Sequence, residues 1–300
     1  MTNGAVSWKP CDAIASSEKL VGIGSEVEIA KKGKVECEMV QPLSGQAIYV
    51  VLLRELKRYW RAKARIISSM AQSFFFLAIF GLGLGGFIGR FGGIDYLSYL
   101  APGVIGMGLL FGSVFSGVSV IFDRQFGFMK EMLVAPVSRT SIVLGKILGG
   151  AVTASIQGVI LMIVAGLMGA FTPTPALVAG ALSAVGVMLL ITAGFVGLGV
   201  AIGSVLSDFH AFQLLATFVM WPLFMLSGVF FPIEVAPFPL QVVMLFDPLF
   251  YGVELLRWCL LGAGTPILGP FGWLIALGVL IGFAAVMVGI GAYLFSRAQV

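Results

Sequence analysis

Six long apolar stretches with hardly any charged residue lie between Ile66 and Phe295, and they constrain the fold more than any other feature. A stretch of about 20 apolar residues crosses the roughly 30 Å hydrocarbon core as a helix, because a helix satisfies its own backbone hydrogen bonds there. Charged residues make up 11% of the chain, against about 25% in soluble domains. The sequence therefore predicts an all-α polytopic membrane protein with six transmembrane helices, at residues 66–88, 99–122, 142–171, 176–205, 212–231 and 271–295.

The segment before the first apolar stretch divides into two parts of different character. Residues 1–44 are polar, and we expect a mostly disordered tail there, with a weak hairpin around the sequence KKGK as the alternative. Residues 45–65 place apolar side chains at helical spacing among basic ones, which predicts an N-terminal amphipathic helix lying in the headgroup plane. The expected domains are therefore the tail, residues 1–44, and a six-helix membrane domain, residues 45–300.

The distribution of Lys and Arg between the connecting segments predicts the orientation in the membrane. Outside the tail, eleven of them lie just before the first stretch, between the second and third, or after the last. Arg90 and Arg257 are the two on the opposite side. Because basic residues accumulate in cytoplasmic loops, we expect a multi-pass protein of the cell (plasma) membrane with both termini in the cytoplasm.

The composition excludes several classes of function. Three scattered cysteines and one histidine give neither a disulfide framework nor a metal site. The pair Gly145-Lys146 lacks the upstream glycine of a phosphate-binding loop, so we expect no ATPase activity and no bound cofactor. Lys146 is instead expected to extend to the cytoplasmic interface. An intramembrane enzyme or a channel is a distant alternative, since neither paired ionisable groups at matching depth nor a filter motif occurs.

The connection between the second and third stretches is long and amphipathic. A short helix in it, carrying apolar side chains among charges, suits docking into a groove of a soluble partner, and a solvated loop anchored by its apolar residues is the alternative. Ser138 or Thr140 is expected to cap the third span. The candidate coupling residues are Asp123, Arg124, Gly127, Phe128, Lys130, Glu131, Pro136 and Arg139.

The segment from Phe231 to Gly269 is apolar but interrupted by prolines. It is too broken for an ordinary span, so we expect a re-entrant pair of short helices on the external side, which is tolerated where protein covers the backbone. Glu254 and Arg257 are three residues apart and can pair on a helix; a structural salt bridge is favoured over substrate contact. The candidate residues of this element are Pro232, Asp247, Pro248, Tyr251, Glu254 and Arg257.

A few polar side chains lie inside the expected spans. Gln72 and Gln157 are the strongly polar uncharged ones, and Ser113 and Ser116 lie on the second span. Hydrogen bonding between helices is the favoured interpretation, and lining of a transport pathway is the alternative. Pairs of glycines four residues apart predict close helix packing; they are Gly108/Gly112, Gly145/Gly149, Gly199/Gly203 and Gly278/Gly282.

Three segments resemble one known family in their order along the chain. IFDRQFGFMKEMLVAPVSR followed by SIVLGK is similar to the cytoplasmic signature of ABC type-2 transporter permeases. LAPGVIGMGLL and SGVFFPIEVAPFPLQVVMLFDPLFYGVELLR resemble two further motifs of that family, in its drug-resistance, daunorubicin-exporter-like branch. The resemblance covers residues 46–300. The chain departs from the family where Asp123-Arg124-Gln125 replaces the frequent Glu-Arg-Glu and where Asp247-Pro248 replaces Asn-Pro.

The resemblance implies a permease subunit of an ABC exporter. ATP and magnesium would then be bound by a separate ATPase subunit, present in two copies and docked on residues 123–139. A second permease, an identical copy, would complete the pathway among the membrane lipids, and no nucleic acid is involved. The implied substrate is an amphipathic drug-like or lipid-like molecule moved outward, with a polysaccharide or lipid-linked glycan as the alternative. The external segment would act as a gate.

Overall fold

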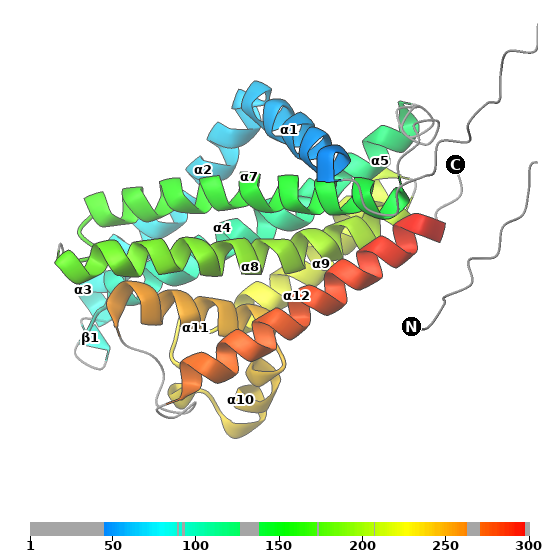
Figure 1. Ribbon diagram of the computed structural model, residues 1–300. Coiled ribbons are helices and arrows are strands. Elements are labelled where there is room, and N and C mark those ends of the chain that lie inside the picture. Colours follow the sequence, from blue (N-terminus) through cyan, green and yellow to red (C-terminus); the bar gives the residue numbers. More distant parts are fainter. Residues whose placement is uncertain are drawn as a thin grey trace, which may run out of the picture. The chain divides into compact units, whose positions relative to one another are not determined.

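The computed structural model describes residues 45–88, 90–91, 94–126, 138–172, 174–206, 208–262 and 271–297. The predictions of a disordered tail or a hairpin at residues 1–44 lie outside these residues. Within them, six helices are long and apolar enough to cross a membrane. An all-α polytopic membrane protein is therefore confirmed (Figure 1). In the described ranges, the strands are the two-residue antiparallel pair β1 (Arg90–Phe91) and β2 (Ile94–Asp95).

Most spans are single helices, but the first two are each divided. The first span consists of α2 (Lys63–Phe76), the π-helical η1 (Leu77–Leu84) and α3 (Gly85–Ile88). The second consists of α4 (Tyr96–Ser116) and α5 (Val118–Gln125), which meet at Gly117. The remaining spans are α7 (Arg139–Leu167), α8 (Pro175–Val205), α9 (Phe209–Leu226) and α12 (Gly272–Arg297).

The helix ends differ from the predicted ends by a few residues, for reasons visible in the backbone. α7 ends at Leu167, short of the predicted Phe171, because Gly169 turns the chain with a φ of 85°. α9 begins at Phe209, because the Asp208 side chain accepts a hydrogen bond from the Ala211 N–H (3.0 Å) and so caps the helix. Caps and turns of this kind move helix ends without changing which stretches cross the membrane.

Helices α4 and α8 form the centre of the bundle. α8 packs against α4, α7, α11 and α12, and Figure 1 shows α7, α8 and α12 running side by side. One close approach is between Gly117 and Gly199, where a Cβ on Gly117 would overlap the Gly199 backbone. Gly203 would likewise place a Cβ 2.8 Å from the Gly117 carbonyl oxygen. The pair Gly199/Gly203 thus packs closely as predicted, whereas Cβ atoms on Gly278 and Gly282 would meet open space.

Replacing Gly117 by valine should destabilise the bundle by about 3 kcal/mol, the upper end for an overpacked site. The added side chain would meet backbone atoms of Gly199, which cannot rotate away. Thermal unfolding of the purified chain in detergent measures the effect. Gly186→Val on α8 is the matched control, since a Cβ there has no neighbour within 4 Å. Equal melting temperatures of the two variants would contradict the packing described.

The amphipathic helix α1 (Gly45–Arg61) packs on the first half of α7. A Cβ on Gly145 would lie 2.7 Å from the Val51 Cβ, and one on Gly149 would lie 2.8 Å from the Glu55 Cβ. The glycine pair Gly145/Gly149 therefore lets α1 approach α7 closely. Figure 1 shows α1 lying across α7. One face of this helix is thus covered by protein.

Two short helices follow α9 and meet at a sharp bend. After the 3-10 turn η2 (Ile233–Val235), α10 (Phe238–Leu245) and α11 (Pro248–Leu261) are bent by 86°, the geometry of a re-entrant loop or a broken span. Pro237 immediately precedes α10, and Pro248 is the first residue of α11, where a proline fits because its missing N–H has no helical partner. Helix α11 then packs against α4, α8 and α12.

Candidate transport cavity and ionic cluster

A cluster of five charged residues lies where α1, α5 and α7 meet. Asp123 of α5 accepts a hydrogen bond from Arg54 Nη2 (2.7 Å) and forms an ion pair with Lys146 Nζ. Glu55 lies 3.9 Å from Lys146 Nζ and 3.9 Å from Arg58 Nε. We call Arg54, Glu55, Arg58, Asp123 and Lys146 the ionic cluster. It joins the amphipathic helix to the second and third spans.

The prediction for Lys146 is wrong. Its side chain does not extend to the aqueous interface but is buried, with 2% of the residue exposed. Helix α1 covers this face of α7, so the ammonium group stays among the carboxylates of Asp123 and Glu55. A buried charge is tolerated only when it is paired. Glu55 was not predicted, and the one signal for it in the sequence is that it is the single acid of residues 45–65.

The described ends of the loop between α5 and α7 are tied to other helices. Arg124 Nη2 donates a hydrogen bond to the Ser204 carbonyl oxygen of α8 (2.9 Å), and Arg139 Nη1 donates to the Ser296 carbonyl oxygen of α12 (2.7 Å). The Ser138 hydroxyl caps α7 by accepting from the Ser141 N–H (3.3 Å). A displacement of the loop ends would therefore act on α8 and α12 as well. The other predicted coupling residues lie outside the described residues; they are Gly127, Phe128, Lys130, Glu131 and Pro136.

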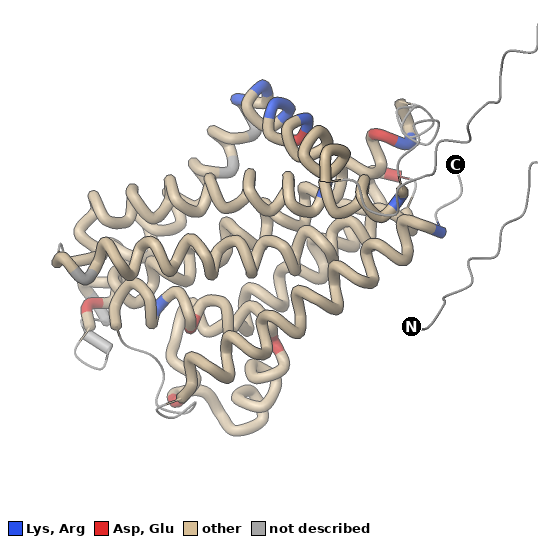
Figure 2. The backbone as a smooth tube through the Cα atoms, viewed as in Figure 1, with Lys and Arg blue, Asp and Glu red and all other residues tan. Residues whose placement is uncertain are grey.

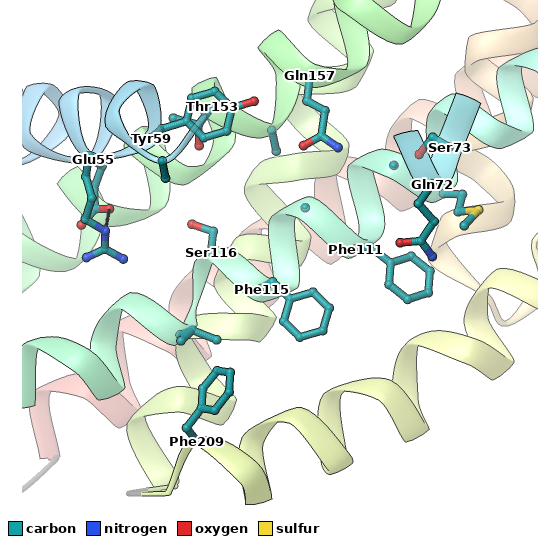
Figure 3. Close-up of a pocket in the computed structure, with 17 residues that line it drawn as sticks. Glu55, Tyr59, Gln72, Ser73, Phe111, Phe115, Ser116, Thr153, Gln157 and Phe209 are labelled. Carbon is teal, nitrogen blue, oxygen red and sulfur yellow. Dashed lines mark ion pairs between the residues drawn. The ribbon is translucent and has the colours of Figure 1, made fainter. Parts of the chain in front are cut away.

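A cavity of about 360 Å³ lies between α1, α2, α4, α7 and α9. Figure 3 shows Phe111, Phe115 and Phe209 toward one side of the cavity and Glu55, Tyr59, Thr153 and Gln157 toward the other, with Ser116 and Gln72 beside the phenylalanines. The aromatic wall contains Phe111, Phe115 and Phe209. The polar and charged lining residues are Glu55, Arg58, Tyr59, Gln72, Ser73, Ser116, Thr153 and Gln157. A cavity with these two walls is suited to a molecule that is itself amphipathic.

Three of the four polar residues singled out in the sequence line this cavity, namely Gln72, Ser116 and Gln157. Ser113 does not line it: this residue is fully buried one turn earlier on α4. For these three residues, lining of a cavity accounts for a polar side chain inside a span without a hydrogen bond between helices. Tyr59 and Thr153 were not predicted as lining residues, because nothing in the sequence brings α1 beside α7.

Tyr59 presents a hydroxyl group to the cavity. Its oxygen is buried and has no hydrogen-bond partner in the part of the chain that the structure describes. Burial raises the pKa of Tyr59 above its ordinary value of 10.0, so at neutral pH the hydroxyl is uncharged and able both to donate and to accept. An unpartnered buried hydroxyl costs free energy unless a ligand or water satisfies it.

A second polar network joins α11 to α4 and to the end of α9. Arg257 Nη1 donates to Glu254 Oε2 (3.4 Å), the ion pair that the spacing predicts. Arg257 Nη2 and the Tyr99 hydroxyl both donate to the Gly228 carbonyl oxygen, at 2.7 and 3.0 Å. The guanidinium also lies 3.9 Å from the centre of the Tyr99 ring, a cation–π contact. Tyr99 and Gly228 were not predicted, because they are far from Arg257 in the sequence.

The other predicted residues of this segment shape its backbone. Asp247 accepts a hydrogen bond from the Leu249 N–H (2.9 Å) and caps α11, which begins at Pro248. The Tyr251 hydroxyl donates to the Leu245 carbonyl oxygen at the end of α10 (2.8 Å). Pro232 precedes η2. These contacts hold the 86° bend between the two helices.

Comparison with known proteins adds sequence relationships to this geometry. The family model described as ABC-2 type transporter matches residues 46–261. Nodulation protein J of Rhizobium leguminosarum bv. viciae is 30% identical over 203 residues, covering 67% of this chain and 76% of that protein. The putative transport permease ycf38 of Porphyra purpurea is 28% identical over 259 residues, covering 84% and 88%. The inner membrane transport permease YadH of Escherichia coli (strain K12) is 26% identical over 233 residues, covering 76% and 89%.

Proposed function

Because the chain belongs to the ABC-2 type transporter family, we propose that it is the permease subunit of an ATP-driven exporter that moves an amphipathic drug-like or lipid-like molecule outward. The resemblance seen in the sequence is confirmed over residues 46–261. Permeases of this family work with an ABC ATPase, and the chain is a multi-pass membrane protein. The substrate class, the direction and the assembly are the proposed part.

The observation that carries this proposal is the cavity between α1 and the spans. It begins at Glu55 and Arg58 of the amphipathic helix and reaches Gln157 and Phe111, well inside the apolar stretches. A molecule with one polar and one apolar part matches its two walls. The cavity thus offers a place for such a molecule between the headgroup region and the interior of the bundle.

We propose that residues 123–139 receive the ATPase. Two ATPase subunits would bind ATP and magnesium, and their closure would push this segment. The ionic cluster supports the idea, because it ties Asp123, at the start of the segment, to α1 and α7. Arg139, at the other end, is tied to α12. A push on the segment would then reach α1, which forms part of the cavity wall.

We further propose that two copies of the chain assemble in the cell membrane, with both termini in the cytoplasm and α10 and α11 toward the outside. Figure 2 supports this orientation: Lys and Arg gather along α1 and at the described ends of α5 and α12. By the positive-inside tendency, that end would lie in the cytoplasm. The bent pair would then be the external gate.

Single-cysteine labelling tests the orientation. In a background in which Cys11, Cys37 and Cys259 are replaced by serine, Pro237→Cys should react with a membrane-impermeant maleimide added to intact cells. Ser138→Cys should react only after the cells are opened. The reverse pattern would show that the bundle is inserted the other way round and would contradict the proposed cytoplasmic docking segment.

Glu131→Ala should uncouple transport while the permease stays folded and inserted. A surface ion pair contributes about 1 kcal/mol or less to a fold, whereas a docking segment transmits motion only while it stays seated on its partner. The measurements are co-purification of the cognate ABC ATPase and ATP-dependent transport of a fluorescent lipid analogue in vesicles. Gly127→Ala is a second variant of the same segment.

Asp95→Ala is the control, an exposed acid at the β1–β2 end of the molecule, away from the proposed docking segment. Full partner binding and full transport in both Glu131→Ala and Asp95→Ala would show that the segment is only a connector. ATP hydrolysis by the purified chain alone would contradict the assignment of the ATPase to a separate subunit.

A further inference from the structure

We propose that the cavity selects an amphiphile whose head is uncharged and rich in hydroxyl or amide groups. The head would bind near Tyr59 and Gln157, and the apolar part would lie along Phe111, Phe115 and Phe209. This inference rests on the proposed function and names the substrate class of the same cavity.

The charges around the cavity argue against an ionic head. Glu55 lies 3.9 Å from each of Arg54, Arg58 and Lys146, so its carboxylate already faces three cations. Its buried Oε1 has no hydrogen-bond partner among the described residues and can accept one from a hydroxyl or amide N–H of a head group. The ionic cluster as a whole holds three cations and two anions, so a cationic head would meet a net positive field. An anionic head would find Arg58, the cation among the described lining residues, already 3.9 Å from both Glu55 and Asp123. Beyond Glu55 and Arg58, the lining contains no charged side chain in the part of the chain described. A charged head moving deeper would lose its hydration without gaining a counter-ion.

The polar wall instead offers groups that both donate and accept hydrogen bonds. The Tyr59 hydroxyl has no partner among the described residues, and Gln157 is buried, with 4% exposed. Ser116 and Thr153 add two hydroxyls, and Gln72, which lies beside Phe111 in Figure 3, adds a second amide. Side chains of this kind match hydroxyl and amide groups of a ligand, because each partner can take either role. A permanently charged quaternary head offers no such match.

The aromatic wall is held in place by neighbouring rings. Phe111 packs edge-on against Trp221 and Phe224 of α9, and Phe209 stacks on Phe122 of α5 at 5.7 Å. Such packing fixes the ring positions before a ligand arrives, which reduces the entropy lost on binding.

Gly112 of α4 also lines the cavity. A Cβ there would lie 3.3 Å from Gln157 Oε1 and would crowd the polar end of the cavity. The absence of a side chain at this position therefore keeps the amide of Gln157 accessible to a head group.

Three probes that share a dodecyl chain test the head-group selectivity. They are dodecyl maltoside, dodecyltrimethylammonium and dodecyl phosphate, titrated below their micelle concentrations into the permease–ATPase complex in lipid nanodiscs, with empty nanodiscs as the blank. Calorimetric affinity and stimulated ATP hydrolysis are measured together. We expect the maltoside to bind at least about tenfold more tightly than either charged probe, the ratio that corresponds to about 1.4 kcal/mol.

Tyr59→Phe assigns the binding to this cavity. It should weaken maltoside binding roughly three- to tenfold, the usual range for one hydrogen bond. The melting temperature should stay the same or rise, because the lost hydroxyl has no protein partner among the described residues. Tyr49→Phe is the matched control, since Tyr49 lies on the same helix but is 61% exposed and outside the cavity; its affinity should not change.

Each other outcome decides against the inference. Tighter binding of the quaternary ammonium or of the phosphate, or unchanged maltoside affinity in Tyr59→Phe, overturns the head-group selectivity. The proposed function stands in that case, provided that the preferred probe still stimulates ATP hydrolysis. If no probe binds or stimulates the complex, the export of amphiphiles through this cavity is itself wrong.

Discussion

Replacing Asp123 by alanine is expected to destabilise the folded chain by about 3–5 kcal/mol, the range for removing one partner of a buried ion pair. Asp123 is 4% exposed and faces both Lys146 and Arg54. Without it, the buried ammonium group of Lys146 keeps the Ser119 hydroxyl, at 3.4 Å, and the more distant Glu55 carboxylate, at 3.9 Å. The loss should appear as a lower melting temperature of the purified chain in detergent, followed by fluorescence-detected size exclusion.

A double variant separates stability from coupling. Asp123→Leu combined with Lys146→Met removes both charges, and replacing a buried pair by apolar side chains is often neutral or stabilising. We expect the double variant to regain most of the stability that Asp123→Ala loses, yet to transport poorly, because α1 and α7 are no longer tied to the start of the proposed docking segment. Full transport by a stable double variant would show that the ionic cluster is structural only.

The sequence was sufficient to locate the spans but not to assemble them. Apolar length alone places six membrane helices, since an apolar stretch of about 20 residues satisfies its backbone in hydrocarbon as a helix. The Glu254–Arg257 pair was also foreseeable, because three-residue spacing brings two side chains together on one helix. The pair between Asp123 and Lys146 was not, because it depends on how α5 and α7 converge and on α1 covering both.

The residues of the cavity were likewise only partly predictable from the sequence. Gln72, Ser116 and Gln157 stood out as polar residues in apolar helices, and all three line it. Their grouping in one place depends on the close approach of α4, α7 and α2, which follows from tertiary packing. Tyr59 carried no signal at all, since on an isolated amphipathic helix it belongs to the apolar stripe. A residue whose role depends on a neighbour distant in sequence cannot be recognised from local spacing.

Replacing Arg257 by leucine should be the second most damaging single change, at about 3–5 kcal/mol. Glu254 is fully buried and Arg257 is 3% exposed. The change removes the cation that faces the buried Glu254 carboxylate, the bond to the Gly228 carbonyl oxygen and the contact with the Tyr99 ring. Helix α11 thus loses three contacts at once: one within the helix, one to the end of α9 and one to α4.

The reactivity of the natural Cys259 shows whether α11 stays packed against its neighbours. It lies two residues after Arg257, and its backbone packs on Gly180 of α8. With Cys11 and Cys37 replaced by serine, Arg257→Leu should make Cys259 react faster with a membrane-permeant maleimide and should lower the melting temperature.

Two further substitutions complete this experiment. Arg257→Lys should be intermediate, because it keeps the charge but cannot reproduce the fork geometry or the stacking of a guanidinium. Arg61→Leu on the exposed end of α1 is the control and should change neither measurement. Unchanged labelling and melting in Arg257→Leu would mean that apolar packing alone seats α11. The Arg257 contacts would then not hold α11 in place, and any opening of the bend between α10 and α11 would not depend on breaking them.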